Sequence, residues 1–428
     1  MEIKTTDYDN FKCSVVAKDT PVVSVIITAD LHASNSPQNT LVGELLTDLL
    51  LAGAGKYSRD DFLQAVAALG SSINVSFSQG RLTISLKSLA ENLSKTLKLL
   101  EVAITNPTFS TSEYKRATKT VKNSLELYKE EARTLAEDAL KRSFYGETDR
   151  HYRYEPVDLI KALNKIKLTD IKSLHKSFLT TFWFVSIGGN KKSVKTTLSL
   201  FKRLKKKPVV PKTNMAIAVL AEKSKKSKVL VELVSSKQNV EFSIGGHLPF
   251  VLGDKDFMAF TFGLTVLGKW GGFAGRLMST VREKEGLTYT IYARTEGVSK
   301  TETGYWRILT FFAPKDAVTG VKSTLREIKK IYQEGITEEE WGRFKEILKT
   351  GEALSYDSLA GTVSLVHSAL VSGIDYEEYK KYQKMLYEVS REDINKTLKQ
   401  YLLPENVVIS AAGPIDKKLE KELKMVIK

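Results

Sequence analysis

The 428-residue chain carries 65 lysine and arginine residues against 50 aspartate and glutamate residues, which gives a formal net charge of +15. With 42% hydrophobic and 27% charged residues, it has the composition of a globular protein of two or three domains with sizeable cores. The single cysteine, Cys13, excludes an intrachain disulfide and a cysteine-based zinc cluster. It favours a reducing compartment, so we expect a cytoplasmic protein.

Neither a membrane nor a nucleic acid is expected as a partner. The longest charge-free stretch, residues 62–80, contains serine, asparagine, glutamine and glycine and is too polar to cross a bilayer. Residues 1–4 have neither an apolar core nor an arginine-rich amphipathic pattern, so we expect no cleaved targeting peptide. The lysine-rich runs at 202–207 and 223–228 are not interleaved with aromatic side chains as nucleic-acid binding would require. They are interpreted as solvated surface and linker charge, with an acidic partner or substrate as the alternative.

Strands and helices are expected in clusters. Residues 21–27 are rich in β-branched side chains and residues 82–86 alternate, so both are predicted strands. Apolar residues at 89, 93, 97, 100 and 104 share one helix face. Further along, residues 287–294 and 305–312 are predicted strands, and apolar positions predict a helix between 315 and 334. Bunched strands followed by bunched helices are typical of an α+β fold.

An internal repeat organises the chain. Residues 168–190 and 391–414 each contain a helix start, an amphipathic helix, a short break and an apolar strand that ends in glycine, with matched positions 223 residues apart. Residues 93–117 and 325–345 agree, with an offset of 226. The sequence therefore predicts two related α+β halves.

The halves are expected at about 1–200 and 230–428, joined by a lysine-rich linker at 201–229 that contains Pro208 and Pro211. We expect the two halves to superpose and to share one strand order.

No common catalytic motif is present. The chain has no HxxEH, HxxxH, GxSxG or GxxxxGK[ST] pattern, and its glycines at 268–275 do not follow dinucleotide-binding spacing. A tight turn before a helix explains these glycines better. A mononuclear zinc site built from distant histidines is left open as an alternative. The five histidines are His32, His151, His175, His247 and His367.

A family resemblance rests on four segments. Residues 271–278 read GGFAGRLM, residues 281–289 read VREKEGLTY, residues 337–340 read TEEE ahead of Lys345, and residues 411–414 read AAGP. Together they resemble the pitrilysin/insulinase (inverzincin) family of zinc peptidases, which includes the mitochondrial processing peptidase. The resemblance implies that each half is an antiparallel-rich sheet covered by helices, and that the chain forms half of a clamshell.

The zinc motif of that family is degenerate here. Counted back from Gly53, the two histidines of HxxEH fall on Glu44 and Asp48, and the catalytic glutamate falls on Thr47. The downstream glutamate ligand falls near positions 123–124, which are asparagine and serine. We therefore expect no metal in this chain. Two i,i+4 carboxylates could hold a hard cation, but a polar or ion-paired helix face is the favoured interpretation.

The second half keeps an arginine and a tyrosine at the family's R-x6-Y spacing, Arg282 and Tyr289. The resemblance implies that this pair contacts the substrate carbonyl and its developing oxyanion. We expect Arg282 to close a helix and Tyr289 to lie on the next strand. Without the resemblance, they are a surface helix residue and a core aromatic.

These features suggest the non-zinc subunit of a heterodimeric zinc metallopeptidase. Its expected partner is a homologous HxxEH-bearing subunit that carries the zinc. Its expected substrate is an unfolded peptide, and endopeptidase activity is expected only in the presence of that partner. The alternative is a catalytically inactive structural or peptide-binding subunit, comparable to the core proteins of the respiratory bc1 complex.

Overall fold

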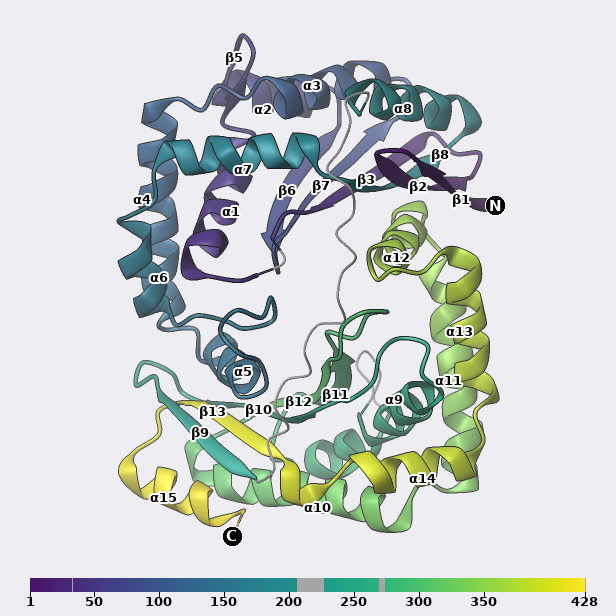
Figure 1. Ribbon diagram of the computed structural model, residues 1–428. Coiled ribbons are helices and arrows are strands. Elements are labelled where there is room, and N and C mark those ends of the chain that lie inside the picture. Colours follow the sequence, from purple (N-terminus) through teal and green to yellow (C-terminus); the bar gives the residue numbers. More distant parts are fainter. Residues whose placement is uncertain (33, 206–226, 269–273, 428) are drawn as a thin grey trace.

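Two α+β halves lie one above the other in Figure 1, which shows the computed structural model of the chain. The structure describes residues 1–32, 34–205, 227–268 and 274–427. Residues 206–226 of the predicted linker and the GGF that begins the first resemblance segment lie outside the described residues. The ends of the predicted linker are corrected, because a helix continues to Leu204 and a strand begins at Lys228. No described helix is long and apolar enough to span a membrane.

The first half is built on a six-stranded sheet in the order β1-β2-β8-β3-β7-β6, antiparallel except for the β2–β8 pair. Its strands are β1 (Glu2–Tyr8), β2 (Phe11–Ala17), β3 (Val22–Asp30), β6 (Ser72–Ser78), β7 (Arg81–Leu89) and β8 (Trp183–Gly189), and a small hairpin adds β4 (Gly53–Ala54) and β5 (Tyr57–Ser58). Its helices are α1 (Pro37–Leu49), α2 (Arg59–Ala67), α3 (Leu93–Thr105), α4 (Thr111–Tyr128), α5 (Ala132–Arg142), α6 (Pro156–Leu163), α7 (Leu168–Thr180) and α8 (Lys191–Leu204).

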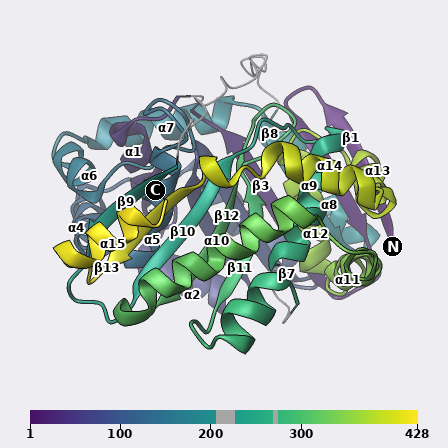
Figure 2. The ribbon, with the colours of Figure 1, turned by 90° about the horizontal axis from the view of Figure 1, so that it is seen from below.

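The second half is built on a five-stranded sheet in the order β11-β12-β10-β13-β9, antiparallel except for the β13–β9 pair. Its strands are β9 (Lys228–Leu233), β10 (Val240–His247), β11 (Ile291–Glu296), β12 (Tyr305–Phe312) and β13 (Val408–Gly413). Its helices are α9 (Lys255–Gly268), the π-helix η1 (Met278–Lys284), α10 (Ala317–Glu334), α11 (Glu338–Ser355), α12 (Leu359–Val371), α13 (Tyr376–Glu388), α14 (Arg391–Tyr401) and α15 (Lys417–Met425), with short 3-10 turns η2 (Pro314–Asp316) and η3 (Pro404–Asn406). Figure 2 shows α10 crossing the outer face of this sheet.

The predicted repeat is confirmed by the strand order. Read from β2, the first sheet runs β2-β8-β3-β7-β6, and the second sheet runs β9-β13-β10-β12-β11. Each element of one series occupies the place of its counterpart in the other, including the single parallel pair. Among residues 1–32, 34–205, 227–268 and 274–427, strand β1 has no counterpart, and it extends the first sheet by one edge.

Several predicted elements are correct and two need correction. The strands at 21–27, 82–86 and 305–312 and the helix at 315–334 are all present. Leu89, however, ends strand β7 instead of sharing the helix face, since α3 starts only at Leu93. The strand predicted from residue 287 begins at Ile291, because residues 285–290 form a turn and an irregular segment.

Each half lends one helix to the other half. Helix α5 belongs to the first half by sequence, but its Leu140 packs against Tyr305 and Val408 of the second sheet. Helix α12 belongs to the second half, but Leu359 and Val363 pack on Val16 of the first sheet. Figure 1 shows α5 against the lower sheet and α12 beneath the upper one. The two halves are therefore joined by a reciprocal exchange of helices.

Strand β8 is shaped for the incoming helix. A Cβ atom on Gly188 would lie 2.4 Å from Cγ2 of Val363 and 2.9 Å from Cδ1 of Leu359, so only glycine allows α12 to approach this closely.

His367 is the polar anchor of α12 in the first sheet. Its Nε2 lies 2.8 Å from the Thr28 hydroxyl on β3, and its Nδ1 lies 3.0 Å from the Ser186 hydroxyl on β8. The ring is almost completely buried, and burial lowers the pKa of His367 to about 3. The imidazole is therefore neutral in the folded protein well below the pH at which an exposed histidine becomes charged.

This buried histidine predicts an acid-sensitive fold. An unfolded His367 protonates near its ordinary pKa of 6.5 and the folded one only near 3, so the unfolded state binds more protons between these values. Its contribution to stability is complete above pH 6.5 and is lost as the pH falls, by up to about 1.4 kcal/mol per pH unit. Urea unfolding of wild type and His367→Gln between pH 7 and 4 should show a shallower pH dependence in the variant. Parallel curves would contradict this assignment.

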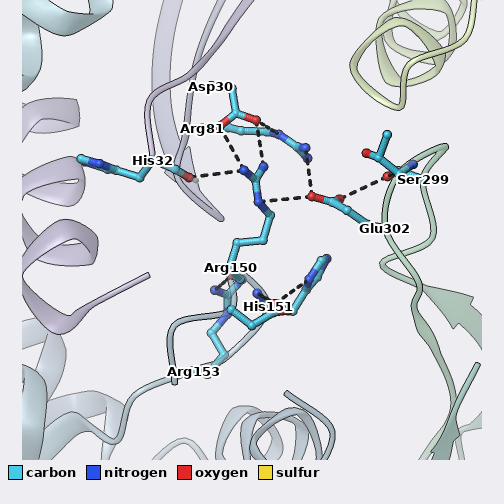
Figure 3. Close-up of polar contacts among 10 residues, drawn as sticks. Asp30, His32, Arg81, Arg150, His151, Arg153, Ser299 and Glu302 are labelled. Carbon is cyan, nitrogen blue, oxygen red and sulfur yellow. Dashed lines mark hydrogen bonds and ion pairs between the residues drawn. The ribbon is translucent and has the colours of Figure 1, made fainter. Parts of the chain in front are cut away.

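A buried ion network forms a second contact between the halves (Figure 3). Arg150, in the segment after α5, donates to Asp30 at the end of β3 at 2.8 Å and lies 3.2 Å from Glu302 in the β11–β12 loop. Arg81 at the start of β7 contacts the same two carboxylates at 3.3 and 3.6 Å. Ser299 donates to Glu302 at 3.3 Å. Two arginines thus tie one carboxylate from each half together.

Candidate functional site

Helix α1 carries the positions where the resemblance places the zinc motif. Its start is capped by Ser36, whose hydroxyl accepts from the Asn39 amide. A leucine-rich face is buried against the first half, which leaves Glu44, Thr47 and Asp48 only partly buried. The Thr47 hydroxyl donates to the Glu44 carbonyl at 2.7 Å. A hydroxyl held in this way cannot serve as the general base that the family's glutamate provides.

Asp48 belongs to an ion cluster. Arg116 on α4 and Arg59 on α2 reach its carboxylate at 2.6 and 3.2 Å, and both arginines also contact Glu113, at 2.9 and 2.8 Å. Although burial by itself raises it, hydrogen bonds from Arg116 and Arg59 hold the pKa of Glu113 below its usual range. The helix face at Asp48 is therefore ion-paired, as the favoured interpretation of the sequence holds.

Glu44 lies in a different environment. Its side chain lines a pocket of about 450 Å³, and burial raises the pKa of Glu44. Within residues 1–32, 34–205, 227–268 and 274–427, its carboxylate has no hydrogen-bond or ion-pair partner. Ser124, one of the two positions matched to the family's third ligand, lines the same pocket. The complete lining is Asn35, Thr40, Glu44, Phe77, Ser78, Gln79, Gly80, Ser124, Leu125, Tyr128, Asp138, Tyr152, Arg153, Tyr154 and Leu159.

The side chains around α1 do not assemble a zinc site. The part of the chain that the structure describes holds no group of three or more histidine, cysteine, aspartate or glutamate side chains suited to a metal ion. His175 is instead 2.8 Å from the Ile104 carbonyl, and His151 pairs with Asp149 at 3.0 Å. With Asp48 bound by two arginines and Thr47 at the base position, the donor set does not fit the zinc that the family implies.

The structure brings Arg282 and Tyr289 together. Arg282 lies near the end of η1, and its guanidinium carbon is 4.6 Å from the centroid of the Tyr289 ring. The Arg282 side chain also contacts Glu283 at 3.3 Å and the Met278 sulfur at 3.5 Å. The expectation that Tyr289 lies on a strand is wrong, because it precedes β11. Its ring is 71% exposed, so it is not a core aromatic either.

The resemblance segments that the structure describes support this pair. Arg276, which begins the turn into η1, donates to both carboxylate oxygens of Glu340 at 2.7 and 2.6 Å and to the Gly335 carbonyl at 2.8 Å. Glu340 also closes the capping box of α11 with Thr337. The TEEE helix start therefore holds the segment that leads to Arg282 in place.

No motif in the sequence indicates the pocket at Glu44. Its tyrosines come from the end of α4 and from the irregular segment before α6. The alternation of Tyr152 and Tyr154 is visible in the sequence, but it matches no motif. Only the fold places these rings beside α1.

Two α+β halves that share one strand order and exchange one helix each form the two-half architecture that the resemblance implies. The chain belongs to the peptidase M16 (insulinase) family. The insulinase model of that family matches residues 20–154, and the model of the peptidase M16 inactive domain matches residues 165–348.

Individual proteins agree with this assignment. The chain is 24% identical over 374 residues to the non-peptidase homolog YmxG of Helicobacter pylori (strain ATCC 700392 / 26695), which covers 86% of this chain and 83% of that protein. The fold is similar to the crystal structure of a peptidase M16 inactive domain from Pseudomonas fluorescens, with a TM-score of 0.84 and 20% identity. The match covers 97% of this chain and 98% of that one. The fold is also similar to the crystal structure of a protease from Helicobacter pylori, with a TM-score of 0.80 and 16% identity. That match covers 96% of this chain and 99% of the protease chain.

Proposed function

We propose that this chain is the non-zinc subunit of a two-chain M16 endopeptidase in the cytoplasm. The observation that carries the proposal is the contact between the partly buried Arg282 and the exposed Tyr289, in a chain whose zinc-motif positions are Glu44, Thr47 and Asp48. A homologous subunit with HxxEH would supply the zinc and the attacking water. This chain contributes the other half of the site to an unfolded peptide.

The chemistry of the pair suits a carbonyl that becomes an oxyanion. The guanidinium of Arg282 is a planar, permanently charged donor, and the phenol of Tyr289 donates one hydrogen bond. The cation stacked on the ring fixes the approach of the two groups to one another. Hydrogen bonds from donors that are already in position become stronger as negative charge develops on the oxygen. They therefore stabilise the transition state more than the bound peptide.

A second candidate is a structural or peptide-binding subunit without a part in catalysis. The relative named as a non-peptidase homolog and the match to the inactive-domain model favour this alternative. The two candidates differ in what Arg282 and Tyr289 contribute, because a scaffold needs neither donor.

The test is a reconstitution. The purified chain alone should contain no stoichiometric zinc and should not cleave unfolded peptides. Mixed with an M16 homologue of similar length that carries HxxEH and is encoded in the same genome, it should form a heterodimer with chelator-sensitive cleavage. About one zinc per isolated chain, with activity of its own, would contradict the divided site. A stable dimer without activity would favour the structural candidate.

A further inference from the structure

The pocket beside α1 holds a carboxylate that nothing in the described chain neutralises. Glu44 projects from α1, and no cation or hydrogen-bond donor among the described residues reaches its carboxylate. The second carboxylate of the lining, Asp138 on α5, is bonded by the Tyr128 hydroxyl and by Lys141 at 3.1 Å. Taking an ionised carboxylate out of water is costly unless a charge partner is present. Glu44 is therefore the one acid of this lining that is open to a ligand.

Aromatic rings surround the same space. Tyr128, Tyr152 and Tyr154 all line the pocket, and the rings of Tyr152 and Tyr154 meet edge to face with centroids 5.0 Å apart. Tyrosine faces attract organic cations through the ring quadrupole, and they also pack against the hydrocarbon stem that carries such a group. The volume of about 450 Å³ lies within the range of small-ligand pockets.

One cation also lines the pocket. Arg153 donates through Nη1 to the Arg150 carbonyl at 3.4 Å. The positive charge of Arg153 disfavours binding of a multivalent cation in this pocket. The other candidate metal ligand on α1, Asp48, is already paired with Arg59 and Arg116. A single carboxylate beside an arginine is a poor site for a hard metal ion, which requires several oxygen ligands. It is sufficient for a monovalent group.

We propose that this pocket binds the primary ammonium or guanidinium group of an organic cation, with Glu44 as its counter-ion and the three tyrosines as its walls. The position that holds a zinc ligand in peptidases of this family is thus reused here as an organic-cation receptor. The group is carried by a lysine or arginine side chain of a peptide, or by a free alkylamine. The inference does not depend on a partner subunit, because every element of the pocket belongs to this chain.

Matched probes test the charge requirement on the full chain. Isothermal titration calorimetry should detect binding of Nα-acetyl-arginine amide and Nα-acetyl-lysine amide. It should detect no binding of the citrulline analogue, which keeps the shape of arginine without its charge, or of the norleucine analogue, which keeps the hydrocarbon stem of lysine without its ammonium group. Binding of free n-butylamine is measured in the same way, for comparison with the blocked amino acids. Tighter binding of the blocked amino acids than of n-butylamine assigns the site to peptide side chains, and the reverse order assigns it to free amines.

Two variants locate the binding. Glu44→Gln keeps the side-chain volume and should weaken the cationic probes by roughly 10–100-fold, the effect of losing a charged hydrogen bond. Ser124→Trp on α4 keeps Glu44 in the sequence but places a bulky ring in the pocket lining, so it should abolish binding. It keeps the test open if Glu44→Gln does not fold. The matched control is Glu126→Gln, since Glu126 pairs with Lys129 outside the pocket and should leave affinity unchanged.

Three results would overturn the proposal. The first is equal binding of the charged and neutral probes. The second is affinity that survives both Glu44→Gln and Ser124→Trp. The third is Glu44-dependent binding of Zn²⁺ or Mg²⁺ with none of the organic cations, which would make the pocket a metal site.

Discussion

Replacing Tyr289 with phenylalanine in the reconstituted heterodimer is expected to lower turnover by roughly 10²–10³-fold, the usual effect of removing one oxyanion donor. The substitution removes a hydroxyl from a ring that is 71% exposed, so the fold and the stacking on Arg282 should persist. Peptide affinity should change much less than kcat, because the lost hydrogen bond strengthens in the transition state. Steady-state kinetics on the heterodimer measure both quantities.

Two further variants complete this test. Arg282→Lys keeps the charge but loses the planar fork, so it should also reduce kcat. Tyr332→Phe removes a hydroxyl from a partly buried tyrosine on α10 and should leave kinetics unchanged. Wild-type rates for both Tyr289→Phe and Arg282→Lys in an intact dimer would rule out the donor role and leave the structural candidate.

Replacing Arg150 with methionine is expected to reduce the free energy of unfolding by about 3–5 kcal/mol, the range for breaking a buried ion pair from one side. The side chains of Arg150 and Glu302 are only 8% and 5% exposed. Arg81 lies farther from Glu302, at 3.6 Å, and cannot replace the lost partner fully. Urea unfolding at neutral pH measures the change.

An exposed arginine provides the matched control. Arg203 contacts Glu101 at 2.6 Å, yet its side chain is 55% exposed. Arg203→Met should therefore cost less than about 1 kcal/mol, because solvent screens such pairs. Equal losses in Arg150→Met and Arg203→Met would show that burial of the network contributes nothing to the join between the halves.

The sequence predicts the repeat well, because the offset between matched segments stays nearly constant, at 223 and 226 residues, even where the residues differ. The sequence predicts that a helix forms better than it predicts which sheet the helix packs against. The leucines of α5 and α12 indicate that one face is buried, but periodicity does not say on which sheet. The exchange is determined by long-range complementarity, such as the close fit of Val363 over Gly188.

The candidate site divides in the same way. Spacing pairs Arg282 with Tyr289, and the stacked geometry agrees. The spacing of the two residues does not show that the strand begins only at Ile291. The exposure of Tyr289 therefore does not follow from the sequence. Glu44 and Asp48 look equivalent on a helical wheel. Two arginines from other helices make one of them an ion-pair member and leave the other facing a pocket.

The exchange of α5 and α12 has a consequence for synthesis on the ribosome. The first sheet is complete when β8 ends at Gly189, but the helix that covers one of its faces ends only at Val371, about 180 residues later. At ~5–20 residues per second, this face stays uncovered for roughly 10–40 s in a nascent chain. An apolar surface exposed for that long is a natural target for chaperones, and a message truncated after the first half would yield a product that cannot bury it.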